Sequence, residues 1–350
     1  MKKILFFILI ILSLFVFLTT HDYRSITQIT FVNSIGIDYN IETDEFTMYF
    51  FILNNYTFAQ TGNSASFINT HAYTAKETDK TILGAENKIR NNSNTKFDLR
   101  HVRSLVLSED FFTNNNLKHL MNYFVNNINY NPSFEVYTTS DDLSELYKIE
   151  HFSEVSGYYT ILVNTQNNIP VNHVTYNDLC NDILIPDYTV AYQKIKLKKG
   201  VIESGEEKYV SLNFDGCSFI NESNQLTSFK YMNLHGLGYF VTNSNRSIVI
   251  KNNNDVYNFL PNKFKIKHYI KNNKLLIKID IDGTFFNNNL GLNENKLKNI
   301  LINKIKSDII IMNETFVNYD IDYFNISYRY KKKYNYKEIE LDFEFNINLI

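Results

Sequence analysis

Residues 102–138, VRSLVLSEDFFTNNNLKHLMNYFVNNINYNPSFEVYT, decide the fold class of this chain. Residues 102–107 are mostly aliphatic, with two valines, and this predicts a strand. Thr113 is a good N-cap residue, and the apolar side chains after it recur at helical spacing: Leu117, Leu120, Met121, Phe124, Val125 and Ile128. Residues 134–138 predict the next strand. A strand, a helix and a further strand in this order favour an α/β or mixed α+β domain.

The same alternation continues towards the N-terminus. Residues 26–38 (ITQITFVNSIGID) are rich in β-branched residues and predict a strand, or a passage from helix to strand. Residues 45–53 (EFTMYFFIL) predict a second, mostly buried strand, because apolar and polar residues do not alternate cleanly in it. Residues 76–90 (KETDKTILGAENKIR) predict a helix that carries Ile82, Ala85 and Ile89 on one face.

The second half of the chain is richer in strand signals. Residues 188–207 turn from basic to acidic around a glycine, and they are the best candidate for a domain boundary. The elements predicted beyond them are short strands at 209–214, 216–220 and 238–241, an alternating strand at 275–282, an amphipathic helix at 293–311 and a strand at 339–349. The last of these, IELDFEFNINL, places apolar residues on one face and acids or amides on the other.

These patterns predict an α+β (mixed α/β) protein of two to three domains, each a mixed or antiparallel sheet packed with helices, after an N-terminal membrane segment. The predicted divisions are an anchor at 1–20, an N-terminal domain at 22–200, a middle domain at 205–260 and a C-terminal domain at 262–350. A length of 350 residues suits this number of domains.

The first twenty residues, MKKILFFILIILSLFVFLTT, predict export. Lys2 and Lys3 precede an apolar run from Ile4 to Leu18, which Ser13 alone interrupts. The run has the length of a signal peptide core and is slightly short for a membrane-spanning helix. Because the positive end stays in the cytoplasm, we expect the rest of the chain outside it. Cleavage of this segment and its retention as an anchor both remain open at this point.

Composition excludes one class of partner and leaves a redox question open. A net charge of −2 gives no electrostatic basis for binding nucleic acid. Cys180 and Cys217 are either two separate small buried side chains or one disulfide, which is possible outside the cytoplasm.

The sequence contains no recognisable catalytic, cofactor-binding or metal-binding motif. It lacks a phosphate-binding P-loop and a nucleophile elbow, and residues 236–238 (GLG) lack the third glycine of a dinucleotide loop. His71, His101 and His119 are too scattered to predict a metal site. Asp280 and Asp282 fit the outward face of a strand better than a calcium loop. The basic residues 329–333 fit a solvated strand end or loop better than a lipid- or polymer-binding patch. We therefore expect no enzyme activity and no cofactor.

Several stretches, taken in order, resemble the Ger(x)C family, the C subunits of spore germinant receptors. They are residues 35–38 (IGID), 97–109 (FDLRHVRSLVLSE), 117–126, 134–138, 178–188 (DLCNDILIPDY), 213–233 (NFDGCSFINESNQLTSFKYMN) and 318–323 (NYDIDY). The family's lipid-bearing cysteine is absent, and His21 stands near its place. Residues 4–20 carry no charge and span about 25 Å as a helix. We therefore expect an uncleaved helical anchor in place of the lipid.

The resemblance implies a three-part mixed α/β protein on the outer face of the spore inner membrane. It also implies two polytopic membrane subunits as partners, which sense small germinants such as amino acids or sugars. The family brings no activity, no small-molecule substrate and no catalytic residue for this subunit. The expected function is thus a non-enzymatic, membrane-anchored subunit of a nutrient germinant receptor. Two alternatives are a membrane-anchored protein that binds a solute or wall polymer, unrelated to germination, and a wall hydrolase, which needs two convergent carboxylates in one cleft.

Overall fold

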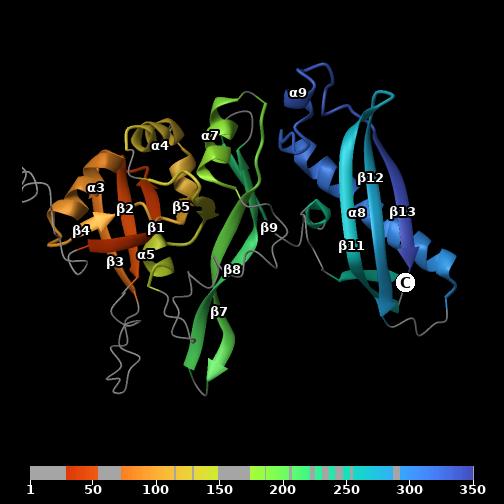
Figure 1. Ribbon diagram of the computed structural model, residues 1–350, viewed down its shortest axis with the longest axis horizontal. Coiled ribbons are helices and arrows are strands. Elements are labelled where there is room, and N and C mark those ends of the chain that lie inside the picture. Colours follow the sequence, from red (N-terminus) through yellow and green to blue (C-terminus); the bar gives the residue numbers. More distant parts are fainter. Residues whose placement is uncertain are drawn as a thin grey trace, which may run out of the picture.

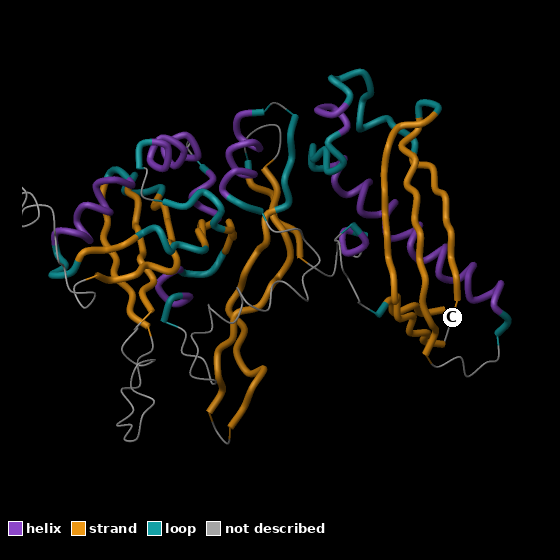
Figure 2. The backbone as a smooth tube through the Cα atoms, viewed as in Figure 1, coloured by secondary structure: helices purple, strands orange, loops and turns teal. Residues whose placement is uncertain are grey.

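The computed structural model describes residues 29–53, 72–113, 116–127, 130–148, 174–185, 187–204, 207–220, 225–230, 236–240, 247–252, 255–286 and 292–349 (Figure 1). In these residues, nine strands form one mixed sheet and four strands form a second, each packed with helices (Figures 1 and 2). The mixed α/β class expected from the sequence is confirmed.

The first sheet has the strand order β3-β2-β1-β5-β6-β7-β8-β9, and β4 pairs with β1 beside this path. Its elements in chain order are β1 (Ile29–Asn40), β2 (Glu45–Leu53), β3 (Ala72–Asp79), α3 (Ile82–Asn91), β4 (Lys96–Asp98), β5 (Ser104–Ser108), the 3-10 helix η2 (Glu109–Phe112), α4 (Asn116–Val125), β6 (Glu135–Thr139), α5 (Leu143–Leu146), α7 (Tyr176–Leu184), β7 (Tyr192–Ser204), β8 (Glu207–Ile220) and β9 (Leu226–Lys230).

The centre of this sheet is parallel. Strands β1, β5, β6 and β7 are neighbours and run in one direction, while β2, β3, β8 and β9 flank them in antiparallel pairs. Parallel neighbours need a long crossover, and helices α4 and α7 lie in two of these crossovers. The predicted strand-helix-strand order at residues 102–138 is therefore the β5-α4-β6 unit of this centre.

Both faces of the first sheet are covered. On one face, α3, α4 and α7 pack their apolar sides on Ile35, Ile37 and Leu105, all fully buried. On the other face, α5 places Leu143, Leu146 and Tyr147 against Phe51, Val106 and Tyr137. Successive residues of a strand point to opposite faces, so β5 contributes Leu105 to one core and Val106 to the other.

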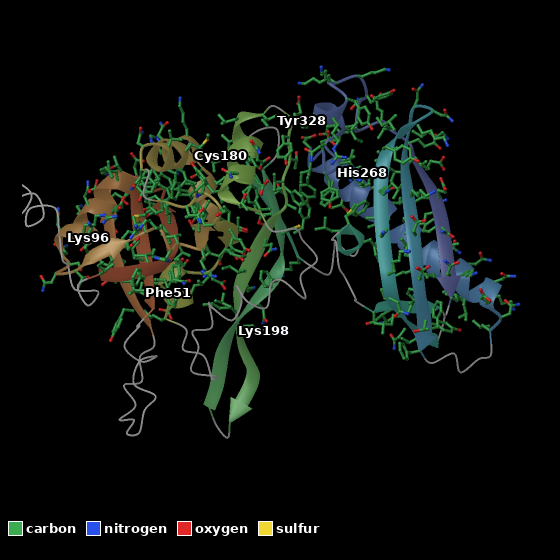
Figure 3. The ribbon with its side chains drawn as sticks, in the orientation of Figure 1. Phe51, Lys96, Cys180, Lys198, His268 and Tyr328 are labelled. Atoms are coloured by element: carbon green, nitrogen blue, oxygen red, sulfur yellow. The ribbon has the colours of Figure 1, made fainter. Side chains whose placement is uncertain are left out.

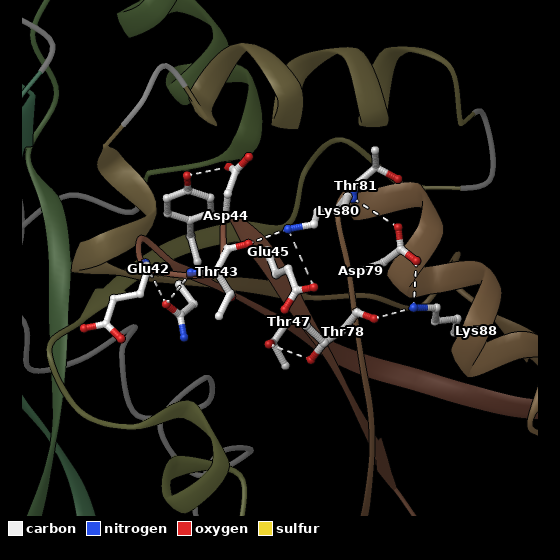
Figure 4. A network of polar contacts seen from close by, with 12 residues as sticks. Glu42, Thr43, Asp44, Glu45, Thr47, Thr78, Asp79, Lys80, Thr81 and Lys88 are labelled. Atoms are coloured by element: carbon white, nitrogen blue, oxygen red, sulfur yellow. Dashed lines mark hydrogen bonds and ion pairs between the residues drawn. The ribbon is translucent and has the colours of Figure 1, made fainter.

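The predicted helix at 76–90 is wrong in its first part, because β3 occupies residues up to Asp79 and α3 begins only at Ile82. Thr81 is the N-cap, and its hydroxyl accepts a hydrogen bond from the amide of Gly84 at 2.9 Å. Lys88 reaches back from α3 to the Asp79 carboxylate and the Thr78 carbonyl, each at 2.8 Å (Figure 4). These contacts separate the edge strand from the helix that follows it.

The second sheet has the order β10-β11-β12-β13. Its elements are the 3-10 helix η4 (Leu237–Tyr239), β10 (Ile248–Asn252), β11 (Asp255–Lys271), β12 (Lys274–Phe286), α8 (Glu294–Asn318), α9 (Ile326–Arg329) and β13 (Leu341–Leu349). The long helix α8 buries Leu301, Ile305 and Ile309 on the sheet, and β12 faces it with alternate isoleucines such as Ile279. Strands β12 and β13 are parallel neighbours, connected through α8 and α9.

Two predictions for this half of the chain differ from the structure. The strand expected at 238–241 is wrong, since residues 237–239 form η4. The two strands expected at 209–214 and 216–220 are one strand, β8, with a bulge near Gly216. The domain divisions near 200–205 and 260–262 stay predictions. They fall within the β7–β8 hairpin and within β11, respectively.

The two sheets meet through aromatic side chains and through a short connecting segment, residues 187–190, here called the strap. Phe219 and Phe229, from β8 and β9, pack edge-on against Phe316 of α8, with ring centroids 4.9 and 5.6 Å away. The Asn325 side chain accepts from the Thr189 amide at 2.6 Å and donates to the Thr189 carbonyl at 3.1 Å. Nearby, Tyr188 contacts Tyr328, which Figure 3 labels beside the second sheet. The strap, residues 187–190, thus ties the first sheet to the second.

The described residues contain no helix that is long and apolar enough to cross a membrane. The predicted anchor at residues 1–20 lies outside the described residues.

Candidate functional site

A cleft of about 570 Å³ lies between α3, β4 and the first residue of β1. Its polar lining combines three cations, Arg90, Lys96 and Arg100, with the carboxylates of Glu86 and Asp98. Apolar side chains and two amides complete it, among them Ile29, Leu83, Phe97 and Asn127. Lys96 is exposed at the rim, on β4, where Figure 3 labels it.

The buried wall of the cleft is built around Glu86. Glu86 lies on the apolar side of α3 with Ile82, Ala85 and Ile89 and is 2% exposed, so its charge needs partners. Arg90, one turn later on α3, binds Glu86 Oε1 through Nε at 2.6 Å and through Nη2 at 2.5 Å. The hydroxyl of Tyr123 donates to Oε2 at 2.5 Å, and a further hydroxyl, Tyr130, bonds to Tyr123. Burial raises the pKa of both tyrosines well above its usual value.

The outer wall carries a second ion pair. Arg100 binds both carboxylate oxygens of Asp98, with Nε at 3.0 and 3.1 Å from Oδ1 and Oδ2. This pairing lowers the pKa of Asp98. Arg90 joins the two walls by donating to the Phe97 carbonyl at 3.4 Å.

This lining is suited to binding a polar group. A glycosidase needs one carboxyl group with a raised pKa as the general acid. Asp98 has a lowered pKa, and the Glu86 carboxylate is already held by Arg90 and Tyr123. The cleft therefore offers hydrogen-bond donors and acceptors of both charges to a polar group.

A second hollow, of about 340 Å³, adjoins the first and shares Leu83 and Asn127 with it. It lies between the start of α3 and the side of α4, against His119 and Asn122. Leu83 is 54% exposed on the ridge between the two hollows. The α3–α4 face thus has a grooved surface with an exposed apolar ridge.

A group of hydroxyls next to a lysine and a glutamate also resembles a catalytic arrangement, but it connects strands. Lys194 Nζ lies 2.6 Å from Glu109 Oε1, which also accepts from Ser228. Ser228 bonds to Ser218 at 2.8 Å, and Ser218 bonds to Thr138 at 2.9 Å. Lys194 contacts the Glu109 carboxylate, and it is Glu109 that accepts from the serine hydroxyl. The chain of contacts joins η2 to β6, β7, β8 and β9.

The IGID stretch has a structural role. Ile35 and Ile37 point into the helix-covered core, while Gly36 faces the other side, beneath the ring of Tyr147. A Cβ on Gly36 would lie 2.5 Å from Tyr147 Cε2. The Tyr147 hydroxyl is 2.8 Å from Ser34 Oγ, so the ring is held in this position. The stretch is therefore where α5 sits closely on the sheet.

The remaining residues considered in the sequence are dispersed. His101 packs edge-on against Phe31 and His119 contacts Phe46, while His71 lies outside the described residues. Where the structure describes the chain, no three His, Cys, Asp or Glu side chains could hold a metal ion. Asp280 and Asp282 lie on the outward face of β12, as predicted, and Asp282 bonds Lys263 and Asn348.

The structure also shows the state of the two cysteines and the position of the basic residues 329–333. Cys180 and Cys217 are both free thiols, and burial raises the pKa of each. Residues 329–333 end α9 and form the turn after it, and Lys332 binds Asp187 of the strap at 3.0 Å. This fits the predicted loop.

The Glu86 cluster was not predicted from the sequence. One signal was present, because an acid on the apolar face of a helix with an arginine four residues later indicates a buried ion pair. The contributions of Tyr123 and Tyr130 depend on the packing of α4 against α3, which no local pattern contains.

Comparison with known proteins adds the family. Residues 22–197, half of the chain, match the model of the spore germination protein N-terminal domain. No curated protein sequence matches the chain. A solved structure described as the crystal structure of the GerBC protein is similar, at 14% identity and a TM-score of 0.46, over 90% of this chain and 96% of that one. The matched residues include the IGID stretch under Tyr147, the Asp98–Arg100 wall of the cleft and Glu109. The chain therefore belongs to the Ger(x)C family of spore germination proteins, the C subunits of germinant receptors.

Proposed function

We propose that this protein is the C subunit of a nutrient germinant receptor and is needed for spore germination. The observation that supports this most is the family match over residues 22–197, which spans the parallel centre of the first sheet and the cleft beside it. The family consists of receptor subunits without catalytic activity, and the paired charges of the cleft suit binding. The subunit contributes a rigid extracytoplasmic body to the receptor and carries out no reaction of its own.

The proposed location is the outer face of the spore inner membrane, with residues 1–20 as an uncleaved helical anchor. The proposed partners are two polytopic membrane subunits. A lipid-modified cysteine serves elsewhere in the family, and an apolar helix here would replace it. The mass of the N-terminal peptide of membrane-extracted protein tests the anchor: a peptide that starts after residue 20 would contradict it.

Deletion of the gene tests the function. Spores without the protein are expected to lose germination with at least one nutrient while they still germinate with a non-nutrient trigger. The intact gene should restore the response. Normal germination of the deleted spores with every nutrient tested would overturn the proposal.

Purification of a tagged full-length chain in mild detergent tests the receptor assignment. Two multi-spanning membrane proteins should co-purify with it in constant proportion. A protein that instead purifies alone and binds a solute or a wall polymer would support the alternative function.

A further inference from the structure

The second sheet ends in a strand with an open edge. In the described part of the chain, β13 pairs with β12 on one side and with no strand on the other (Figure 1). The Leu275 amide of β12 donates to the Glu340 carbonyl at 2.9 Å, so the backbone groups of even-numbered residues face β12. Backbone N–H and C=O groups alternate in direction along a strand. The backbone groups of residues 341, 343, 345, 347 and 349 therefore point outward. Of these, the Phe343 amide donates to Asp342 Oδ1 at 2.9 Å, a bond that a joining strand would have to replace.

The edge of β13 offers a joining strand two things, outward-facing backbone groups and a row of apolar side chains. The outward backbone groups belong to the apolar residues Leu341, Phe343, Phe345, Ile347 and Leu349. Four of these side chains are only half-buried, because β13 is the last strand over the α8 core. Lys306 of α8 lies over the Phe343 ring at 5.5 Å. An added strand would bond the outward groups and cover the half-buried apolar row.

The opposite side of the same sheet consists of the short strand β10 and, beyond it, an unpaired stretch of β11 that carries features which hinder such pairing. β10 pairs only with residues 255–259 of β11. Beyond them, β11 has Pro261 with a bulge and the exposed lysines Lys263, Lys265, Lys267 and Lys271. The Ile270 amide there donates to the Tyr330 hydroxyl at 2.9 Å. Proline, bulges and lysines are the usual means of blocking an edge strand. β13 has none of them.

The sequence of β13, LDFEFNINL, is complementary to itself in one antiparallel register. With a two-fold axis at Phe345, every apolar residue faces an apolar residue: Leu341 faces Leu349, Phe343 faces Ile347, and Phe345 faces itself. On the outward face, Asp342 stands opposite Asn348 and Glu344 opposite Asn346. Each acid thus meets an amide, and an amide nitrogen has two N–H groups to donate. One N–H of Asn348 bonds Asp282, which leaves the second for Asp342, and Glu344 also pairs with Lys278 of its own chain at 2.6 Å. Opposite pairs share one face of a sheet, so this register keeps both faces consistent.

Other arrangements of two such strands are less suitable. A parallel pair places Asp342 opposite Asp342, and an axis at Glu344 places two glutamates opposite each other, which is unfavourable. A shift by an odd number of residues puts acids against the apolar row. An axis at Asn346 avoids like charges but leaves Leu341 without a partner.

We propose that β13 is a self-association edge, at which two copies of this chain join their second sheets antiparallel about Phe345. The interface is isologous, so it closes at two copies. It is independent of the receptor assignment, because it depends only on β13 and its neighbours.

Two substitutions at one exposed position give a matched test with the full-length chain in detergent. Asn346 faces outward, and Glu344 of the second copy stands opposite. N346K creates two opposite-charge pairs in the dimer and should tighten the dimer Kd about 2- to 30-fold. N346E creates two like-charge pairs and should weaken it by a similar factor. Sedimentation equilibrium with matched detergent density measures both, and circular dichroism confirms equal folding.

Disulfide trapping tests the register. A mixture of E344C protein with differently tagged N346C protein should form a mixed cross-link, because residues 344 and 346 are opposite in this register. N346C alone should cross-link poorly, whereas an axis at Asn346 would give the reverse result. A wild-type chain that stays monomeric at all accessible concentrations would overturn the proposal. So would a dimer that responds equally to N346K and N346E, or a different protein found bound at β13 in place of a second copy.

Discussion

Replacement of Gly36 by alanine should destabilise the first sheet through one contact. The added Cβ lies 2.5 Å from Tyr147 Cε2, whereas carbon atoms pack well at about 3.5–4.0 Å. The ring must therefore move by about 1 Å. It has little room, because it stacks on Phe51 at 5.6 Å and its hydroxyl is bonded to Ser34.

The expected net cost is about 2 kcal/mol. Overpacking in a core costs about 1–3 kcal/mol, and a displaced ring also loses the Ser34 hydrogen bond, about 1 kcal/mol. The removal of a strand glycine returns about 0.5–1 kcal/mol through the unfolded chain. If Tyr147 is first replaced by leucine, the clash disappears. Gly36→Ala should then be neutral or slightly stabilising.

Hydrogen exchange measured by mass spectrometry on the full-length chain gives the local free energy. A cost of about 2 kcal/mol corresponds to about 30-fold faster exchange in peptides from β1 and β5. The double-mutant cycle isolates the contact, with an expected coupling of about 2 kcal/mol. If Gly36→Ala costs the same in the wild-type background and in the Tyr147→Leu background, the clash with the ring is not the cause. The reasoning would then be refuted.

Three further predictions concern the rest of the molecule. Gly216→Ala should cost about 3 kcal/mol or more, seen as faster exchange in β8 and β9, because Gly216 has φ of +147° and its Cβ would lie 1.8 Å from the Phe229 carbonyl oxygen. Burial raises the pKa of Asp182 to about 8, so this carboxyl group stays protonated to a higher pH in the folded chain than in the unfolded chain. The free energy of unfolding should therefore fall as the pH rises from about 4 to 8. The slope is at most about 1.4 kcal/mol per pH unit, and Asp182→Asn should remove it in a melting series against pH. Asn325→Asp keeps the acceptor for the Thr189 amide but loses the donor to its carbonyl, and exchange in the strap should rise by about 2- to 12-fold.

Much of the fold was predictable because the buried elements show in the sequence, either as a continuous apolar run or as an alternation of apolar and polar residues. The apolar run at 45–53 has the same bounds as β2, and the isoleucines of 275–282 lie on the buried face of β12. The edge strand β3 was predicted as the start of a helix. It has no buried face to impose alternation, and its position depends on backbone pairing with β2. The pairing order of the strands also depends on long-range contacts that no local pattern reports.

The candidate cleft was less predictable for a related reason. Its ion pairs at Glu86–Arg90 and Asp98–Arg100 are local, four and two residues apart, and could be read from the sequence. Their meeting in one cleft requires α3 to pack beside β4. Tyr123 reaches Glu86 from α4, 37 residues further along the chain.

The family match tells more about the fold than about a functional site, because glycines such as Gly36 and Gly216 serve packing. Gly36 fits beneath a tyrosine, and Gly216 has a backbone conformation suited to glycine at a bulge. Both are requirements of packing within this chain, and Gly36 lies within the matched residues 22–197. A partner surface has no such requirement within the chain. It must be found from groups that the fold leaves unused, such as the outward backbone groups of β13, which lie beyond the matched residues 22–197. The family match therefore reports the fold of the chain, while the edge of β13 supports the proposal of how two copies of the chain would meet.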